Sequence, residues 1–201
     1  MRRFIYLIII SVFLLPTFSP SAPRFYVNTG ISNPYAPDTF TNHWRSGYNL
    51  GLGAGYPLST NLEIIGQFHY DNFQLDDISY LKDITDSDLY ASATGGSTWI
   101  AGFLADLKLY SPLSEKSTIT PYLVGGLGLF TKTIQKIRIT LEEGTYEETK
   151  ESDMPFGAGL GLGAEILMGK RTYFIVEGRF NVLFTDETTV YMPIKLGISI
   201  K

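Results

Sequence analysis

The sequence contains no cysteine, so a disulfide framework, a thiolate zinc site and a lipid-modified cysteine are all excluded. Histidine is scarce as well, with 2 residues in a chain of 201. Basic residues are not in excess, because 16 Lys and Arg stand against 20 Asp and Glu. This balance argues against nucleic acid as a partner.

A hydrophobic run long enough to span a membrane is also missing. The longest one, Phe4–Leu15, is too short for a bilayer core of ~30 Å, and Arg2 and Arg3 precede it. We therefore expect a cleavable signal peptide over residues 1–22 and a mature domain over 23–201, with an N-terminal membrane anchor as the alternative. Cleavage leaves a more acidic mature chain, which needs a source of stability other than disulfides. A closed β-barrel supplies one, because every strand is hydrogen-bonded on both sides.

What the chain does contain is glycine in alternating segments. Ser46–Tyr56 reads SGYNLGLGAGY, Thr120–Phe130 reads TPYLVGGLGLF and Phe156–Leu167 reads FGAGLGLGAEIL. A period of two indicates β-strands with two unlike faces. Glycine weakens a strand interior, so its frequent use here needs a reason, and a tightly curved barrel with a crowded lumen provides one.

The chain after residue 22 divides into eight candidate strands joined by alternately long and short connections. Brief turns on one side and long loops on the other are typical of outer-membrane barrels, and most of the segments reach the 9–11 tilted residues that a membrane-spanning strand needs. The sequence therefore predicts an all-β fold, an eight-stranded antiparallel up-and-down transmembrane β-barrel. The expected strands are Arg24–Ser32, Ser46–Leu58, Asn61–Phe73, Ser97–Ser111, Thr118–Thr131, Met154–Met168, Arg171–Thr185 and Thr189–Lys201.

Within each strand the charges fall on the less apolar face. In Asn61–Phe73, for example, Ile64 and Phe68 share one parity, and Gln67 and His69 share the other. A Lys or Arg that faces lipid at mid-depth costs about 2–4 kcal/mol, so we expect the apolar faces to point outward. The mixed signs predict a salt-bridged lumen without an open channel; the alternative is a charged solvent face on an ordinary sheet. The predicted lumen charge network is Glu63, Asp106, Lys108, Glu165, Glu177, Arg179 and Lys195.

Aromatic residues lie near the strand ends, where spanning barrels carry belts at both membrane interfaces. The high β-propensity of aromatic residues is the alternative explanation. The residues expected in these belts are Tyr26, Tyr48, Tyr56, Tyr70, Trp99, Tyr110, Tyr122, Phe130, Phe156, Tyr173 and Phe184.

These features resemble the small outer-membrane β-barrel family of the OmpA/OmpX type, a porin-family-like domain. The resemblance is carried by the leader and by Pro121–Phe130, Gly157–Glu165 and the closing strand Met192–Ile200. It implies a bacterial outer-membrane location, with membrane lipid and the barrel-assembly machinery as partners. One departure is that the chain ends in Ile200-Lys201, whereas many members end on an aromatic residue read by that machinery.

Catalytic and metal-binding patterns are weak in this sequence. His69 and Asp71 share a strand face, but no motif marks a nucleophile, so we expect no enzyme and no cofactor. A lipid-modifying barrel enzyme that uses His69 is the alternative. The loops Gln74–Gly96 and Lys132–Asp153 are acidic, without the spacing of a known Ca²⁺ loop, so we expect no metal site, although weak divalent bridging to anionic lipid is a hypothesis.

The third long loop alternates again over Lys132–Leu141, which predicts a hairpin beyond the membrane with Glu143 and Gly144 near its tip. Exposed β-edges can pair with partner strands. The sequence therefore predicts a structural or surface-interaction role through the long loops, with a possible adhesion partner. The alternatives are a soluble periplasmic lipocalin-like barrel that binds an apolar ligand, and a narrow pore.

Overall fold

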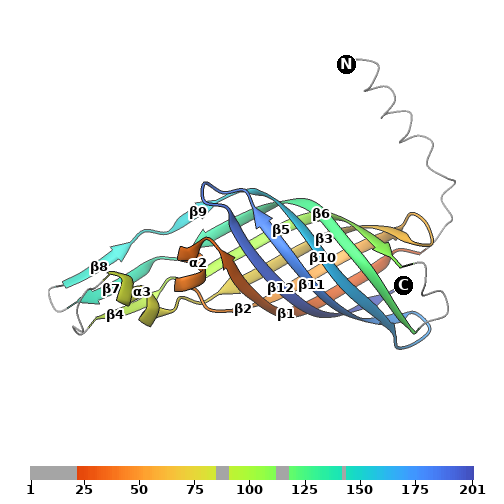
Figure 1. Ribbon diagram of the computed structural model, residues 1–201, viewed down its shortest axis with the longest axis horizontal. Coiled ribbons are helices and arrows are strands. Elements are labelled where there is room, and N and C mark those ends of the chain that lie inside the picture. The colour runs from red at the N-terminus through yellow and green to blue at the C-terminus, as the bar shows by residue number, and fades with distance from the viewer. Residues whose placement is uncertain (1–21, 85–90, 112–117, 142–143) are drawn as a thin grey trace, which may run out of the picture.

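The chain forms a closed barrel in which each strand is antiparallel to both of its neighbours (Figure 1). The computed structural model describes residues 22–84, 91–111, 118–141 and 144–201. Strand order follows the sequence, and the first strand pairs with the last, which confirms the predicted fold class. The barrel strands are β1 (Arg24–Ala36), β2 (Gly47–Pro57), β3 (Leu62–Phe73), β5 (Thr98–Tyr110), β6 (Ile119–Ile134), β10 (Phe156–Leu167), β11 (Thr172–Leu183) and β12 (Thr189–Ile200).

The two ends of the barrel differ. The turn end carries the short connections 58–61 and 168–171 and the C-terminus. The loop end carries the long connections, which extend well beyond the barrel wall (Figure 1). None of the helices in the described residues is long and apolar enough to cross a membrane. The predicted leader, residues 1–22, falls almost entirely outside the described ranges.

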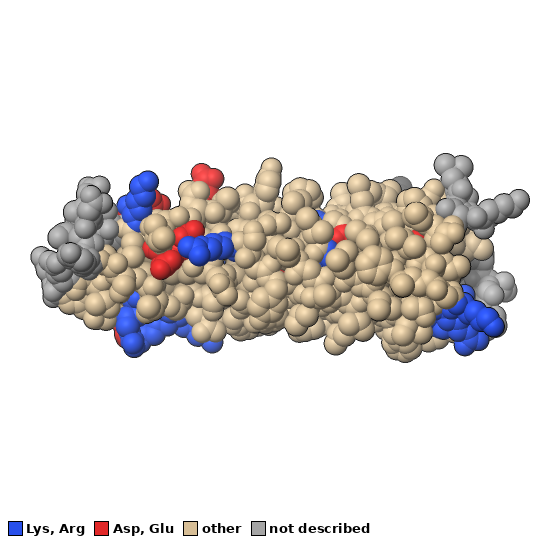
Figure 2. All heavy atoms as spheres, turned by 90° about the horizontal axis from the view of Figure 1, so that it is seen from below, with Lys and Arg blue, Asp and Glu red and all other residues tan. Residues whose placement is uncertain are grey.

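The barrel wall is apolar outside and polar inside. On β11, Phe180 is 46% exposed, whereas its neighbour Arg179 is 1% exposed. On β12, Leu196 is 49% exposed and Lys195 is 2% exposed. Figure 2 shows the result: charged atoms gather near the two ends, and the wall between them is almost entirely uncharged. The lipocalin-like alternative was wrong, because it required the apolar side chains inside and the charges in water.

The long loops contain structure that the alternation did not predict. Two short helices, α2 (Asp38–His43) and α3 (Asp77–Ile84), lie at the loop end. Strands β7 (Ile137–Leu141) and β8 (Gly144–Glu148) form the expected hairpin, although Glu143 lies outside the described residues. A further strand, β4 (Ser92–Gly95), pairs with β7 to complete a three-stranded sheet. Strand β9 (Glu151–Asp153) extends the edge of β6.

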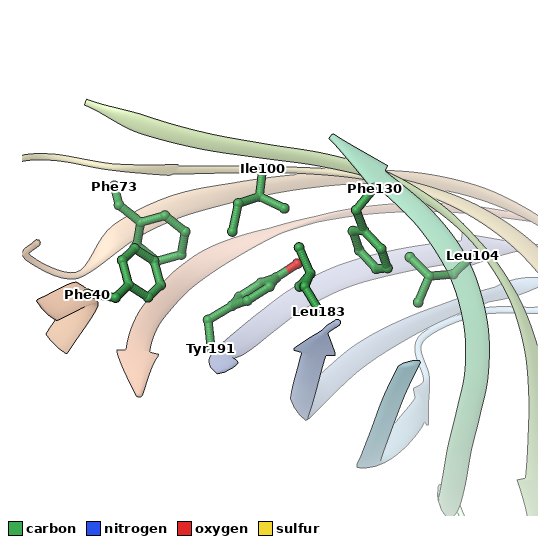
Figure 3. Close-up of a cluster of buried hydrophobic side chains, with 7 residues drawn as sticks. All are labelled: Phe40, Phe73, Ile100, Leu104, Phe130, Leu183 and Tyr191. Carbon is green, nitrogen blue, oxygen red and sulfur yellow. The ribbon is translucent and has the colours of Figure 1, made fainter. Parts of the chain in front are cut away.

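The aromatic belts were predicted too broadly. At the loop end, aromatic rings lie side by side on the outer face of three neighbouring strands, with Tyr48 on β2, Tyr70 on β3 and Trp99 on β5. Adjacent ring centroids are 6.2 and 6.3 Å apart. At the turn end, by contrast, Tyr26 and Tyr122 are 4% and 3% exposed and point into the barrel. Phe130 is also buried inside, near the loop end (Figure 3). Sequence position near a strand end does not say which face a side chain occupies; parity does.

Glycine in the wall allows close approach at defined positions. A Cβ added to Gly30, on the inner face of β1, would lie 1.9 Å from the Ile194 carbonyl oxygen of the neighbouring strand. A Cβ added to Gly178, on the outer face of β11, would meet nothing within 4 Å. The wall therefore requires glycine at the first position but not at the second.

We expect Gly30→Ala to lower the free energy of unfolding by about 1–3 kcal/mol, because the new methyl group overpacks against backbone. The matched variant Gly178→Ala should stay within about 0.5 kcal/mol of the parent. Urea unfolding of the refolded protein in lipid vesicles measures both. Equal midpoints for the two variants would contradict the close approach at Gly30.

Candidate functional site

An ionic cluster fills the interior at the turn end. Glu165 accepts hydrogen bonds from Arg24 at 2.9 Å and from Lys108 at 3.1 Å. The Tyr110 hydroxyl lies 2.6 Å from Glu63 and 2.9 Å from Glu165, so it bridges the two carboxylates. These groups come from β1, β3, β5 and β10, so the cluster ties together strands that are not all neighbours. Removing one member leaves a buried charge without its partner.

Aromatic rings surround the buried lysine of this cluster. The Lys108 ammonium lies 4.4 Å from the ring centroid of Tyr26 and 4.2 Å from that of Tyr122, within cation–π range. Tyr26 donates its hydroxyl to Glu63 at 2.7 Å, and Tyr122 donates to Glu177 at 3.0 Å. The tyrosines that were expected in a membrane belt therefore serve inside the barrel as hydrogen-bond donors to carboxylates.

A second ionic layer crosses the middle of the barrel. Arg179 on β11 makes two hydrogen bonds to the Asp106 carboxylate on β5, one at 3.1 Å, and both side chains are fully buried. Beside them, the Lys195 ammonium lies 3.7 Å from Glu177 and donates to Nδ1 of His69 at 3.1 Å. The structure thus places every residue of the predicted charge set inside the barrel, in two layers.

The loop end of the interior is closed by an apolar cluster (Figure 3). Its side chains project from the barrel strands and from α2 toward one another. Phe40 is the member from α2; it is 3% exposed, and its ring centroid lies 5.0 Å from that of Phe73. Phe40 was not predicted to be buried, because it lies in a segment that was expected to be a loop between strands. The cluster consists of Phe40, Phe73, Ile100, Leu104, Phe130, Leu183 and Tyr191.

His69, the histidine considered for catalysis, and its strand neighbour Asp71 have separate hydrogen-bond partners. Asp71 accepts a 2.5 Å hydrogen bond from the Ser32 hydroxyl, which in turn accepts from the Asn49 amide at 3.0 Å. His69 instead lies against Lys195. His69 and Asp71 are 2% and 1% exposed. The geometry therefore supports structural roles for both residues.

The acidic loops are partly neutralised by nearby cations. Arg45 donates to Asp76 at 2.9 Å, and this hydrogen bond holds the pKa of Asp76 down at about 2. Glu147 pairs with Lys136 and with Arg138, and hydrogen bonds to both lower its pKa. Within the described ranges, no three His, Asp or Glu side chains are placed to hold a metal ion. The acidic residues 86, 88, 142 and 143 lie outside those ranges.

The three-stranded sheet and α3 form a small packed unit, which we call the platform, defined by β4, β7, β8 and α3. Its core joins Tyr80 of α3 to Ala93, Ile137 and Ile139 of the sheet. Burial, together with a hydrogen bond to Glu148, raises the pKa of Tyr80. A cavity of about 440 Å³ lies beside this unit. Its lining includes Trp44, Tyr80, Ile134, Ile137, Glu148 and Glu151.

We expect Arg179→Gln to destabilise the barrel by about 3–5 kcal/mol, because it leaves the fully buried Asp106 carboxylate without its cationic partner. The double variant Asp106→Asn/Arg179→Gln should lose less stability than Arg179→Gln, since it removes both charges of the pair. The control Arg138→Gln breaks an exposed ion pair with Glu147 and should cost at most about 1 kcal/mol. Urea unfolding in vesicles measures all three. A double variant no more stable than Arg179→Gln would contradict this pairing.

Comparisons with known proteins agree with this architecture. The sequence matches the family model described as outer membrane protein beta-barrel domain over residues 5–199. None of the curated proteins matches the chain. Among solved structures, the chain is similar to Neisserial surface protein A, with a TM-score of 0.57 and 13% identity, over 90% of this chain and 97% of that chain.

Two further solved structures show the same fold. One is a major outer membrane protein from Thermus thermophilus, with a TM-score of 0.56 and 11% identity, over 90% of this chain and 99% of that chain. The other is OprG from Pseudomonas aeruginosa, with a TM-score of 0.54 and 13% identity, over 89% and 95% of the two chains. With its apolar exterior and closed antiparallel wall, the chain belongs to the outer membrane protein beta-barrel family and is located in the bacterial outer membrane.

Proposed function

We propose that the protein is a non-enzymatic outer-membrane barrel that acts at the cell surface, as a structural component or as a binding surface presented by its long loops. In barrels of this type the short turns face the periplasm and the long loops face outward. The turn end is therefore periplasmic, and the loop end, with the platform, is extracellular. The observation that carries the proposal is that folded structure continues well beyond the barrel wall at this end (Figure 1).

The platform has the features of a recognition surface. One face of its sheet is covered by α3, and the other carries polar side chains such as Arg138, Thr140 and Glu147. Strands β4 and β8 are the two edges of this sheet. Edge strands can add a partner strand through main-chain hydrogen bonds, with side chains on alternate positions giving specificity. This arrangement supports a protein or peptide partner at the cell surface.

The interior supports a role at the surface rather than in transport. An eight-stranded barrel is only wide enough for side chains to fill, and here the two ionic layers and the apolar cluster occupy that space. The ionic layers then serve to hold the strands in register. We further propose that residues 1–22 are removed on export, that the barrel-assembly machinery inserts residues 23–201, and that outer-membrane lipid surrounds the wall.

Removing the β7–β8 hairpin tests the surface role. We expect that replacing residues 137–148 with a short Gly-Ser turn abolishes cell-to-cell aggregation and adhesion of the expressing bacteria to arrayed proteins and glycans. The barrel itself should remain folded, because the eight wall strands are untouched. A heat-dependent shift in gel mobility reports the folded barrel.

The matched control is Asp186→Asn, which changes one exposed residue in the connection between β11 and β12, outside the platform, and leaves the hairpin intact. It should adhere like the parent chain. If the parent chain promotes no more adhesion than an empty vector, or the hairpin variant adheres as well as the parent, the surface-binding role is wrong.

A further inference from the structure

Exposed acidic side chains of the described residues are confined to one end of the barrel, whereas exposed cations occur at both ends. Within the described residues, every exposed Asp or Glu lies at the extracellular end, and those of the wall strands point inward and are buried. The periplasmic end has exposed Lys170, Arg171 and Lys201. In Figure 2 the right-hand end, which is the turn end, accordingly shows blue atoms grouped together near the uncharged wall.

Backbone pairing brings these three cations to one place, which we call the basic patch (Lys170, Arg171 and Lys201). The turn between β10 and β11 is closed by hydrogen bonds from the amides of Met168 and Gly169 to the Thr172 carbonyl, at 3.0 and 3.3 Å. The Lys201 amide donates to the Arg171 carbonyl at 2.9 Å, which places the end of β12 beside the start of β11. None of the ion pairs in the described residues uses a member of the basic patch.

The basic patch lies where the apolar wall ends. Met168, next to the turn, is 68% exposed, and Ile200, next to Lys201, is 54% exposed. Ile200 has the outward parity of β12, and Met168, one residue past the end of β10, continues the outward parity of that strand. Lys and Arg near such a boundary extend their charged ends toward the headgroup region. The basic patch therefore meets the headgroups of the periplasmic leaflet.

We propose that the basic patch is a binding site for an anionic phospholipid of the periplasmic leaflet. Arginine and lysine are the residues that bind phosphate, and each one near an anionic membrane surface adds to the attraction. The phosphate contacts the three cations, and the acyl chains lie along Met168 and Ile200. The site depends on the membrane placement of the barrel and not on the surface-binding role, so either proposal can fail alone.

Native mass spectrometry of the protein released from micelles with equal phosphatidylglycerol and phosphatidylcholine tests this site. The parent chain should retain phosphatidylglycerol in preference to phosphatidylcholine. In K170Q/R171Q/K201Q we expect that preference to fall at least roughly tenfold, since three cations act together. The control K82Q/K136Q/K150Q removes three positive charges from the extracellular end and should keep the preference of the parent. An equal preference in parent and K170Q/R171Q/K201Q overturns the proposal.

Two further measurements identify what the basic patch recognises. The charge-retaining variant K170R/R171K/K201R should fold and keep the preference for phosphatidylglycerol. A folded variant without that preference would contradict recognition through charge. Glycerol phosphate, which has the same phosphate but no acyl chains, should fail to displace the bound lipid at millimolar concentration. Efficient displacement would mean that the basic patch takes free phosphate compounds, and the assignment to phospholipid would be wrong.

Discussion

The ion pair between Arg179 and Asp106 shows the constraint on which the rest of the structure depends. A charged side chain in a membrane-spanning wall is costly toward lipid, and inside a narrow barrel it is costly unless paired. Both requirements are met when the charged side chains of the wall point inward and find an opposite charge or a hydrogen-bond partner there. The cost of charge toward lipid explains why the charged side chains of the wall point inward. The cost of unpaired charge inside explains why they form the two ionic layers.

The filled interior places further demands on the wall and the mouth of the barrel. Large inward side chains such as Arg179 and Tyr122 leave little room for Cβ atoms on neighbouring strands, and glycine at positions 159 and 163 supplies that room. At the extracellular mouth the ionic pattern gives way to an apolar cluster, with Phe40 of α2 inserted among strand residues. Interaction with other molecules is thereby left to the outer surfaces, which differ in charge between the two ends.

The barrel could be predicted from sequence because its main signal is local. Alternation with period two in β3 and β11 identifies the strands and both faces without any knowledge of contacts. Pairing partners could not be predicted, since Arg179 meets Asp106 across 73 residues of chain through a register that the whole barrel sets. Helices α2 and α3 were missed because they are short and depend on tertiary contacts, through Phe40 and Tyr80. The inward tyrosines were missed because position near a strand end was given more weight than parity.

The polarity of the wall can be measured directly, because the chain has no cysteine of its own. A single spin-labelled cysteine at position 180 or 196 reports whether that outward site contacts acyl chains or water, through its collision rates with oxygen and with a water-soluble nickel chelate. In bilayers we expect both labels to favour oxygen strongly, whereas a label at Lys150 at the extracellular end should favour the nickel chelate. Labels at 180 and 196 that collide freely with the nickel chelate would contradict the barrel polarity described above.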